Sequence, residues 1–226
     1  PELPGDPAYY ARVLTAAGYF ESVAFSTEDK VRNASYQQNA RRIEAFESLG
    51  SMEQYLKSLG ILLAIKPFDA NGLTRIVQLI NKTNQFNVTT RRYDQGEVTA
   101  MMADPSCITL QARLSDVYGE NGMIAVIIAY QAATELTIDS WLMSCRVLNR
   151  QVEYCLMNEL ILIAMQRGIT TINASYIPTN RNAIVENLYS NLGFGKSGSP
   201  AGTGETLWTL PVSDYREHEV FIKVEK

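Results

Sequence analysis

The stretch KTNQFNVTTRRY, residues 82–93, gathers the polar side chains best suited to recognising a substrate. Its amides, hydroxyls and two arginines surround one phenylalanine and one tyrosine, and such groups discriminate the polar atoms of a ligand when they are buried. Asn and Thr also satisfy the backbone of irregular turns, which is the alternative interpretation. We expect a substrate-binding wall formed by Asn84, Gln85, Phe86, Thr89, Thr90, Arg91 and Tyr93, with Ser144 added from a later segment.

Arg91 and Arg92 stand out because clustered basic residues are few in this acidic chain. The 226 residues include 20 Lys and Arg against 24 Asp and Glu, a net charge of -4. This balance argues against nucleic acid as a partner, which favours basic proteins. The two arginines are suited to guiding an acidic protein or holding a phosphate, although two solvated arginines would look the same in the sequence.

Nucleophiles and metal ligands are scarce in the sequence. The three cysteines show no CxxC spacing and the chain has one histidine, so we expect no metal site. Cys145 lacks a nearby base, and we expect a buried structural thiol there. Glu135 and Asp139 are candidate general bases, or else charges at a strand edge.

The apolar pattern is that of a cytoplasmic protein. No apolar run approaches the 18 residues of a membrane span, so we expect no membrane association. The few cysteines give no disulfide framework, which agrees with a reducing compartment.

The elements that must position these residues fall into two parts. Residues 1–60 are expected to form a helical appendage, with helices at 6–18, 26–50 and 51–60. Residues 61–226 are expected to form one α/β domain. Its predicted strands cover 61–68, 107–114, 123–131, 135–147, 170–177, 205–212 and 219–226. Its predicted helices cover 72–84, 97–102, 150–167 and 182–194, and a mobile loop is expected at 195–205.

This order of elements, with the closing motif NxxxxxxYxxLGF at residues 182–194, resembles the GNAT acyltransferase fold. The resemblance implies an α/β (α+β) domain with a mixed, mostly antiparallel sheet flanked by helices. KTNQFNVTTRRY, IDSWLMSCRVLNRQVE and YIPTNRNAIVENLYSNLGF more specifically resemble the C-terminal part of FkbH-like proteins, the HAD subfamily IIIC family of polyketide biosynthesis. FSTEDKVRNASYQQNARR and SMEQYLKSLG resemble the segment that follows their HAD domain.

The FkbH resemblance implies a role in acyl or glyceryl transfer. These proteins dephosphorylate 1,3-bisphosphoglycerate and deliver a glyceryl group to an acyl carrier protein. The HAD step needs a DxDxT motif, which these 226 residues lack. The implied partners are therefore an acyl carrier protein, the HAD domain of the full-length protein and a small acyl or glyceryl substrate.

The GNAT resemblance also implies a cofactor site. In GNAT enzymes a turn of the form R/Q-x-x-G-x-G/A presents backbone N–H groups to the pyrophosphate of acyl-CoA. Asn149 and Gln151 stand here where glycines are expected, so their side chains crowd a diphosphate. A carrier protein's phosphopantetheine has one phosphate and is less demanding. The expected contacts to phosphopantetheine or acyl-CoA are Arg146, Asn149, Arg150, Gln151, Val152 and Asn182, the two arginines through charge-assisted hydrogen bonds.

Three functions stay open at this point. The favoured one is a GNAT-like domain of an FkbH-type protein that binds the carrier arm or its thioester along the fourth strand. The second is a free-standing acyl-CoA-dependent N-acyltransferase. Tyr189 would then be the general acid, because it matches the tyrosine that protonates the leaving thiolate in many GNAT enzymes, unless it is only a half-buried aromatic. The third is a structural domain that packs against a HAD partner.

Overall fold

The computed structural model describes residues 6–10, 13, 27–202 and 204–225. The chain divides into two compact units, Pro1–Ser48 and Leu49–Lys226. The first unit contains a 3-10 helix, η1 (Pro7–Tyr9), and the 22-residue helix α2 (Thr27–Ser48). Most of the predicted first helix, and the predicted start of the second at Ser26, lie outside the described residues.

Helix α3 (Met52–Leu59) belongs to the second unit, together with the sheet. Its N-cap is Ser51, whose hydroxyl accepts a hydrogen bond of 3.2 Å from the backbone N–H of Gln54. Gly60, with φ of 52°, ends the helix in the left-handed conformation and leads directly into the first strand.

One eight-stranded mixed sheet forms the frame of the second unit, with the strand order β6-β7-β5-β4-β3-β2-β1-β8. Neighbouring strands are antiparallel except for the pairs β1–β8 and β4–β5. The strands are β1 (Ile61–Lys66), β2 (Cys107–Asp116), β3 (Gly119–Ala132), β4 (Glu135–Met143), β5 (Thr171–Tyr176), β6 (Gly195–Gly198), β7 (Thr206–Pro211) and β8 (Ile222–Glu225).

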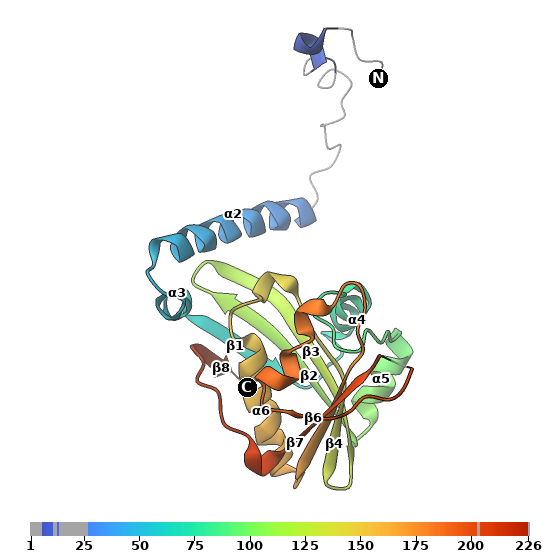
Figure 1. Ribbon diagram of the computed structural model, residues 1–226. Helices are drawn as coiled ribbons and strands as arrows, with labels where there is room; N and C mark the ends of the chain where they lie inside the picture. The colour runs from blue at the N-terminus through green and yellow to red at the C-terminus, as the bar shows by residue number, and fades with distance from the viewer. Residues whose placement is uncertain (1–5, 11–12, 14–26, 203, 226) are drawn as a thin grey trace. The chain divides into compact units, whose positions relative to one another are not determined.

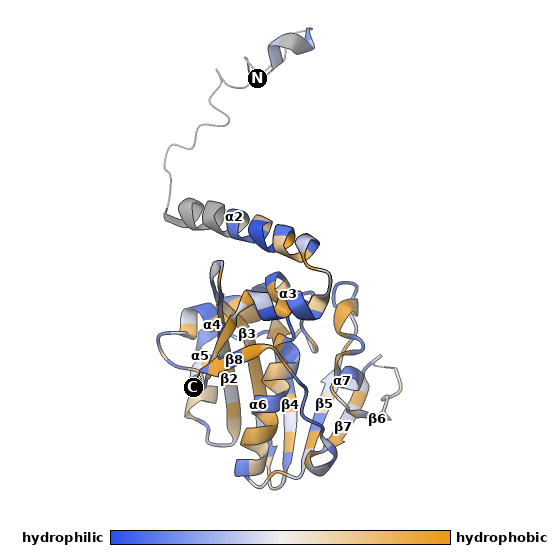
Figure 2. Ribbon diagram, turned by 90° about the vertical axis from the view of Figure 1, so that its left-hand side faces the viewer, coloured by the Kyte–Doolittle hydropathy of each residue, from blue (hydrophilic) through white to orange (hydrophobic). Residues whose placement is uncertain are grey.

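Helices cover both faces of the sheet. Figures 1 and 2 show α4 (Leu73–Lys82) and α5 (Gln95–Ala103) on one face and α6 (Val152–Gln166) on the other. The central strand β3 is therefore buried on both sides, and every residue from 123 to 129 is at most 2% exposed. Figure 2 shows hydrophobic residues running along the central strands.

The closing segment differs from the predicted helix at 182–194. It forms a 3-10 turn, η3 (Ala183–Val185), and a four-residue helix, α7 (Leu188–Asn191). The predicted strand at 135–147 ends at Met143 and continues as a 3-10 turn, η2 (Cys145–Val147). Strand β6 lies within the stretch predicted as a mobile loop, and a last 3-10 turn, η4 (Val212–Asp214), follows β7.

Among the described residues, no helix is both long and apolar enough to cross a membrane.

Candidate functional site

Strands β4 and β5 part where their pairing stops. They pair only from Glu135 opposite Thr171 to Ile138 opposite Ala174, although β4 continues for five more residues. A parted pair of this kind leaves a free strand edge, to which an extended ligand can add by backbone hydrogen bonds. The gap is therefore a candidate binding site.

Residues 86–88 of the chain itself fill this gap. The N–H of Val88 donates to the carbonyl of Trp141 at 3.2 Å, and the N–H of Met143 donates to the carbonyl of Phe86 at 3.0 Å. On the other side, the N–H of Ile177 donates to the carbonyl of Val88 at 2.9 Å. The segment thus acts as a short inserted strand, which we call the plug.

Asn182 fixes the plug to the segment after β5. The amide nitrogen of its side chain donates to the carbonyls of Asn87 at 2.9 Å and Ile177 at 3.0 Å. The side-chain oxygen accepts from the backbone N–H and the hydroxyl of Thr179. Asn182 is fully buried, and all of its side-chain atoms are occupied in these bonds. The structure therefore places this predicted cofactor contact inside the fold.

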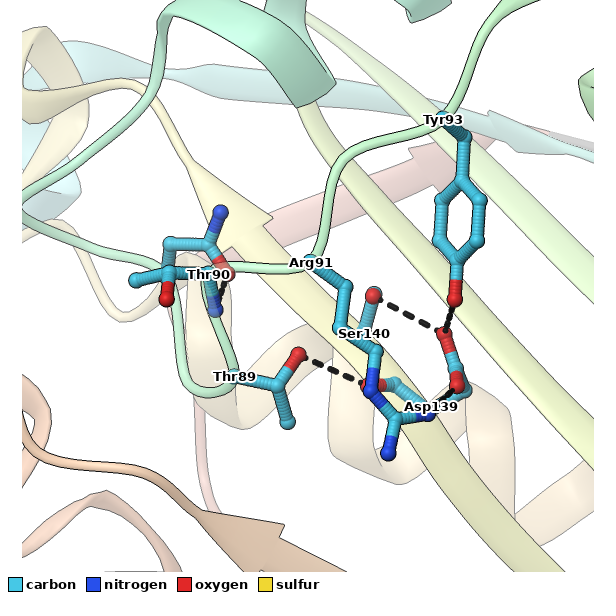
Figure 3. A network of polar contacts seen from close by, with 7 residues as sticks. Thr89, Thr90, Arg91, Tyr93, Asp139 and Ser140 are labelled. Carbon is cyan, nitrogen blue, oxygen red and sulfur yellow. Dashed lines mark hydrogen bonds and ion pairs between the residues drawn. The ribbon is translucent and has the colours of Figure 1, made fainter.

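The polar residues that follow the plug converge on Asp139 of β4 (Figure 3). The carboxylate pairs with Arg91 and accepts from the hydroxyls of Tyr93 at 2.7 Å and Ser140 at 3.0 Å. The hydroxyl of Thr89 donates to the Asp139 carbonyl at 2.9 Å. The Asp139 side chain is only 6% exposed, so these bonds hold a buried charge in place.

Two further residues of this stretch stabilise its backbone. Thr90 adopts a φ of 55°, and its N–H donates to the side chain of Asn87 at 2.9 Å. Arg92 donates to the carbonyls of Ile80 and Thr83 and to the side chain of Asn84. The Arg92 guanidinium thereby caps the C-terminus of α4.

The phenol of Tyr93 stays protonated in this network. Burial, followed by the hydrogen bond to Asp139, raises the pKa of Tyr93 to about 12.

A cavity of about 900 Å³ opens beside the plug, and we call it the cationic cavity. It lies between α4, the residues that follow this helix, and the residues that follow β4. Five of the predicted site residues line it: Asn84, Gln85, Phe86, Ser144 and Arg146. The remaining lining residues are Arg75, Gln78, Leu79, Lys82, Thr83, Met143, Cys145, Asn180 and Arg181. Cys145 is exposed, so the prediction of a buried thiol is wrong.

The turn between β4 and α6 has an unusual backbone. Asn149 and Gln151 both have a φ of 62°, in the left-handed region that favours glycine. These are the two positions where the resemblance to GNAT enzymes implied glycines. The turn leads into the N-terminus of α6 at Val152, where the backbone N–H groups of a first helical turn and the helix dipole favour an anion.

The side chains of this turn have different surroundings. Arg150 pairs with Asp116 at 3.2 Å, and both side chains are less than 10% exposed. The side chain of Gln151 accepts from the N–H of Phe221 at 3.3 Å. Arg146 is exposed, and its Nε donates to the hydroxyl of Ser144 at 3.2 Å. Of the two arginines predicted to hold a phosphate, Arg146 lines the cationic cavity, whereas Arg150 is buried in its ion pair with Asp116.

A second cavity, of about 350 Å³, lies at the first turn of α6, and we call it the helix cavity. It is lined by Phe86, Leu148, Asn149, Glu153, Tyr154, Ile184, Leu188 and Asn191. Phe86 also lines the cationic cavity, so the plug supplies the wall that the two cavities share. Glu153 Oε2 is buried without a hydrogen-bond partner among the described residues, and burial raises the pKa of this carboxyl.

Tyr189 lies in the core and lines neither cavity. Its side chain is 0% exposed, and its hydroxyl has no hydrogen-bond partner among the described residues. Its ring packs at 5.1 Å from that of Phe194 and 6.4 Å from that of Trp208. Burial, and then the charge of Asp139, raise the pKa of Tyr189 far above its ordinary value. Proton donation from this phenol would first require a path to a substrate.

Glu135, the second candidate base beside Asp139, is the first residue of β4 and lies away from the plug at the other end of the strand. Its carboxylate is exposed and accepts from the side chain of Asn173 at 3.0 Å. Within the described part of the chain, no three His, Cys, Asp or Glu residues come close enough to hold a metal ion.

The fold is that of the GNAT acetyltransferases. The structure resembles the ribosomal-protein-S18-alanine N-acetyltransferase of Escherichia coli, with a TM-score of 0.51 over 66% of this chain and 94% of that one, at 17% identity. It also resembles the GNAT domain of S. lividans PAT, with a TM-score of 0.52 over 65% of this chain and 89% of that one, at 16% identity.

A third similar structure is spermidine N-acetyltransferase from Vibrio cholerae in complex with CoA and spermine. The TM-score is 0.50 over 68% of this chain and 97% of that one, at 13% identity. No protein-family model matches the sequence, and no curated protein matches it. The similarity therefore establishes the GNAT fold.

Proposed function

We propose that this chain is an acyl-transfer domain of GNAT fold that binds the phosphopantetheine arm of an acyl carrier protein, as the C-terminal part of an FkbH-type protein. The arm carries an acyl or glyceryl thioester. The phosphatase chemistry belongs to a HAD domain, since this chain has no DxDxT motif. The observation that carries the proposal is the left-handed backbone of Asn149 and Gln151 in the turn before α6, at positions where the GNAT pattern implies glycines.

The turn and the first turn of α6 together suit one phosphate better than two. The left-handed backbone and the N-terminus of α6 favour one phosphate. The carboxyl of Glu153, in the first turn of the same helix, opposes negative charge there, and it opposes a diphosphate more strongly than a single phosphate. The residues therefore fit a phosphopantetheine arm better than the diphosphate of CoA.

The plug determines where the arm lies. Phe86 and Val88 use the backbone groups of β4 along which we expected the arm to bind. The helix cavity remains open to it, with apolar contacts from Leu148, Ile184 and Leu188. The arm reaches the edge of β4 only if the plug leaves the gap.

Two alternatives each have one observation in their favour. The GNAT fold is shared with acetyltransferases, one of which was solved with CoA, and this favours an acyl-CoA-dependent N-acyltransferase. The filled gap between β4 and β5 favours a structural domain that packs on a HAD partner.

A calorimetric titration with holo carrier protein, apo carrier protein and acetyl-CoA separates the three functions. Binding of the holo form alone is the expected result. Tight binding of acetyl-CoA would favour the N-acyltransferase, and an acyl-transfer assay with amines would follow. Binding of none of the three would favour the structural role.

A further inference from the structure

The cationic cavity concentrates positive charge in a chain whose net charge is -4. Arg75 and Lys82 reach it from α4, Arg146 from the turn after β4, and Arg181 from the segment after β5. None of the residues that line the cavity is acidic. Three separate segments of the chain therefore bring cations to one hollow.

These cations are not neutralised by the described part of the chain. None of the four forms an ion pair with a described carboxylate. Arg75 has only a 3.3 Å hydrogen bond to Gln78, and Arg146 bonds to Ser144 and to the carbonyl of Asn121. Burial, and then the charges of Arg146 and Arg113, lower the pKa of Arg75, which indicates mutual repulsion.

The rest of the wall is rich in amides. Gln78, Asn84, Gln85 and Asn180 line the cavity among the cations and offer donors and acceptors to hydroxyl or carbonyl groups. A volume of about 900 Å³ lies within the range of small-molecule sites. The charge selects an anion, and the amides select a polar one.

The position of the cavity links it to the transfer site. Phe86 lines both this cavity and the helix cavity, which we assign to the carrier arm. A ligand in the cationic cavity and the arm would therefore both contact Phe86, which suits the two substrates of a transfer reaction.

We infer that the cationic cavity binds a small polar anion, bearing a phosphate or carboxylate group, through Arg75, Lys82, Arg146 and Arg181. The anion is the second substrate or the acyl group itself, and this role rests on the proposed function. Its binding does not, because the charges and the cavity exist whether or not a carrier protein docks. The same phosphate chemistry is also offered by the carrier arm, and the experiment below separates the two sources.

Cys145 provides a local probe of the cavity. It lines the cavity and is exposed, whereas the other two cysteines are buried. The rate of its modification by N-ethylmaleimide, a neutral reagent, can be followed by mass spectrometry of the intact protein. The measurement is made with inorganic phosphate, citrate, glycerol or free 4′-phosphopantetheine, with sodium chloride keeping the ionic strength constant.

Phosphate and citrate are expected to slow the modification at least threefold at saturation, and glycerol is expected to leave it unchanged. The double variant Arg75→Gln/Arg181→Gln should lose this protection. The control variant Lys196→Gln/Arg216→Gln removes the same amount of charge from exposed residues outside the cavity and should keep the protection. If the double variant does not fold, the single variant Lys82→Gln should still weaken the protection, because Lys82 is exposed and its replacement leaves the core intact.

Two results would overturn the inference. Equal loss of protection in both double variants would reduce the effect to the general charge of the protein. Protection by 4′-phosphopantetheine alone would assign the charges to the carrier arm and not to a small anion. A carrier protein that fails to bind in the calorimetric titration, with phosphate still protecting Cys145, would contradict the proposed function and leave the anion site standing.

Discussion

The N–H of Val88 donates to the carbonyl of Trp141 at 3.2 Å, so a segment that follows α4 is inserted against β4 where β5 has moved away. This contact occupies the edge of β4 beyond Ile138, where the pairing with β5 has stopped. It also separates the cationic cavity from the helix cavity through the neighbouring Phe86. The place where the carrier arm binds depends on whether the plug is a permanent wall or a segment that a ligand displaces.

Shortening Phe86 should join the two cavities and weaken the plug. Phe86 is 5% exposed, and truncation of a buried phenylalanine to alanine costs about 3 kcal/mol or more. We expect Phe86→Ala to lower the free energy of unfolding by this amount in urea titrations. Phe86→Leu, which keeps most of the volume, should cost less than about 1.5 kcal/mol. Equal losses for the two variants would show that the side chain does not fill the gap.

The charge of Asp139 should be needed to hold the segment that follows the plug. Asp139→Asn keeps the shape but removes the ion pair with Arg91 and weakens the bonds from Tyr93 and Ser140. We expect a loss of about 2 kcal/mol in the free energy of unfolding. Glu53→Gln breaks the exposed pair with Lys57 and should cost less than about 0.5 kcal/mol. A loss at Asp139 no larger than that at Glu53 would contradict the buried network.

The hydroxyls of two tyrosines should respond in opposite ways to removal. Tyr189→Phe deletes a buried hydroxyl that has no partner among the described residues, so stability should stay the same or rise by about 1 kcal/mol. Tyr93→Phe deletes a bond to Asp139 and should lower stability by about 1 kcal/mol. Thermal unfolding of both variants gives the comparison. A marked destabilisation by Tyr189→Phe would mean that its hydroxyl is bonded in the folded protein.

Glu153 should make stability depend on pH. Its folded pKa is raised by burial above the ordinary 4.5, so the folded state holds this proton more tightly than the unfolded state. Stability from this group is thus present at low pH and is lost as the pH rises through the folded pKa. Glu153→Gln should be more stable than the parent at pH 7, and the difference should vanish below about pH 4.

The matching control for this carboxylate is Glu225→Gln, an exposed change on β8, which should show no such difference. Because Glu153→Gln also removes the negative charge from the first turn of α6, it should strengthen the binding of acetyl-CoA. Stability of Glu153→Gln that stays equal to the parent across the whole pH range would contradict a pKa of Glu153 raised by burial.

Most of the fold was predictable because hydrophobic periodicity carries it. The buried run of β3, the long apolar helix α6 and the caps that bound α3, Ser51 and Gly60, appear directly in the sequence. The structure of residues 182–194 was not predictable, because their apolar spacing suits a helix while the side chain of Asn182 bonds the carbonyl of Asn87, 95 residues earlier, and that of Ile177. Tertiary contacts of that kind leave no periodic signal.

The site was predictable only in part, and KTNQFNVTTRRY shows why. Its first half, with Asn84, Gln85 and Phe86, lines the cationic cavity. Its second half holds the backbone of the segment in place, because Thr89, Arg91 and Tyr93 bond to Asp139, which lies 46 to 50 residues further along the chain. The contribution of Arg75 and Arg181 to the cavity was missed, because residues so far apart in sequence meet only through the fold.

The turn at residues 149–151 should bind CoA only after its side chains are removed. Asn149→Gly/Gln151→Gly relieves two left-handed residues, which should stabilise the protein by about 1 kcal/mol, and it clears space for a second phosphate. Asn149→Ala keeps a Cβ atom and should show neither effect.

Calorimetry of the parent chain and of this double glycine variant, with holo carrier protein and acetyl-CoA side by side, tests the central claim most directly. We expect the parent to bind holo carrier protein and not acetyl-CoA, and the glycine variant to gain acetyl-CoA. Acetyl-CoA that binds the parent as tightly as it binds the variant would rule out the proposed preference for the carrier arm and identify the domain as an acyl-CoA site.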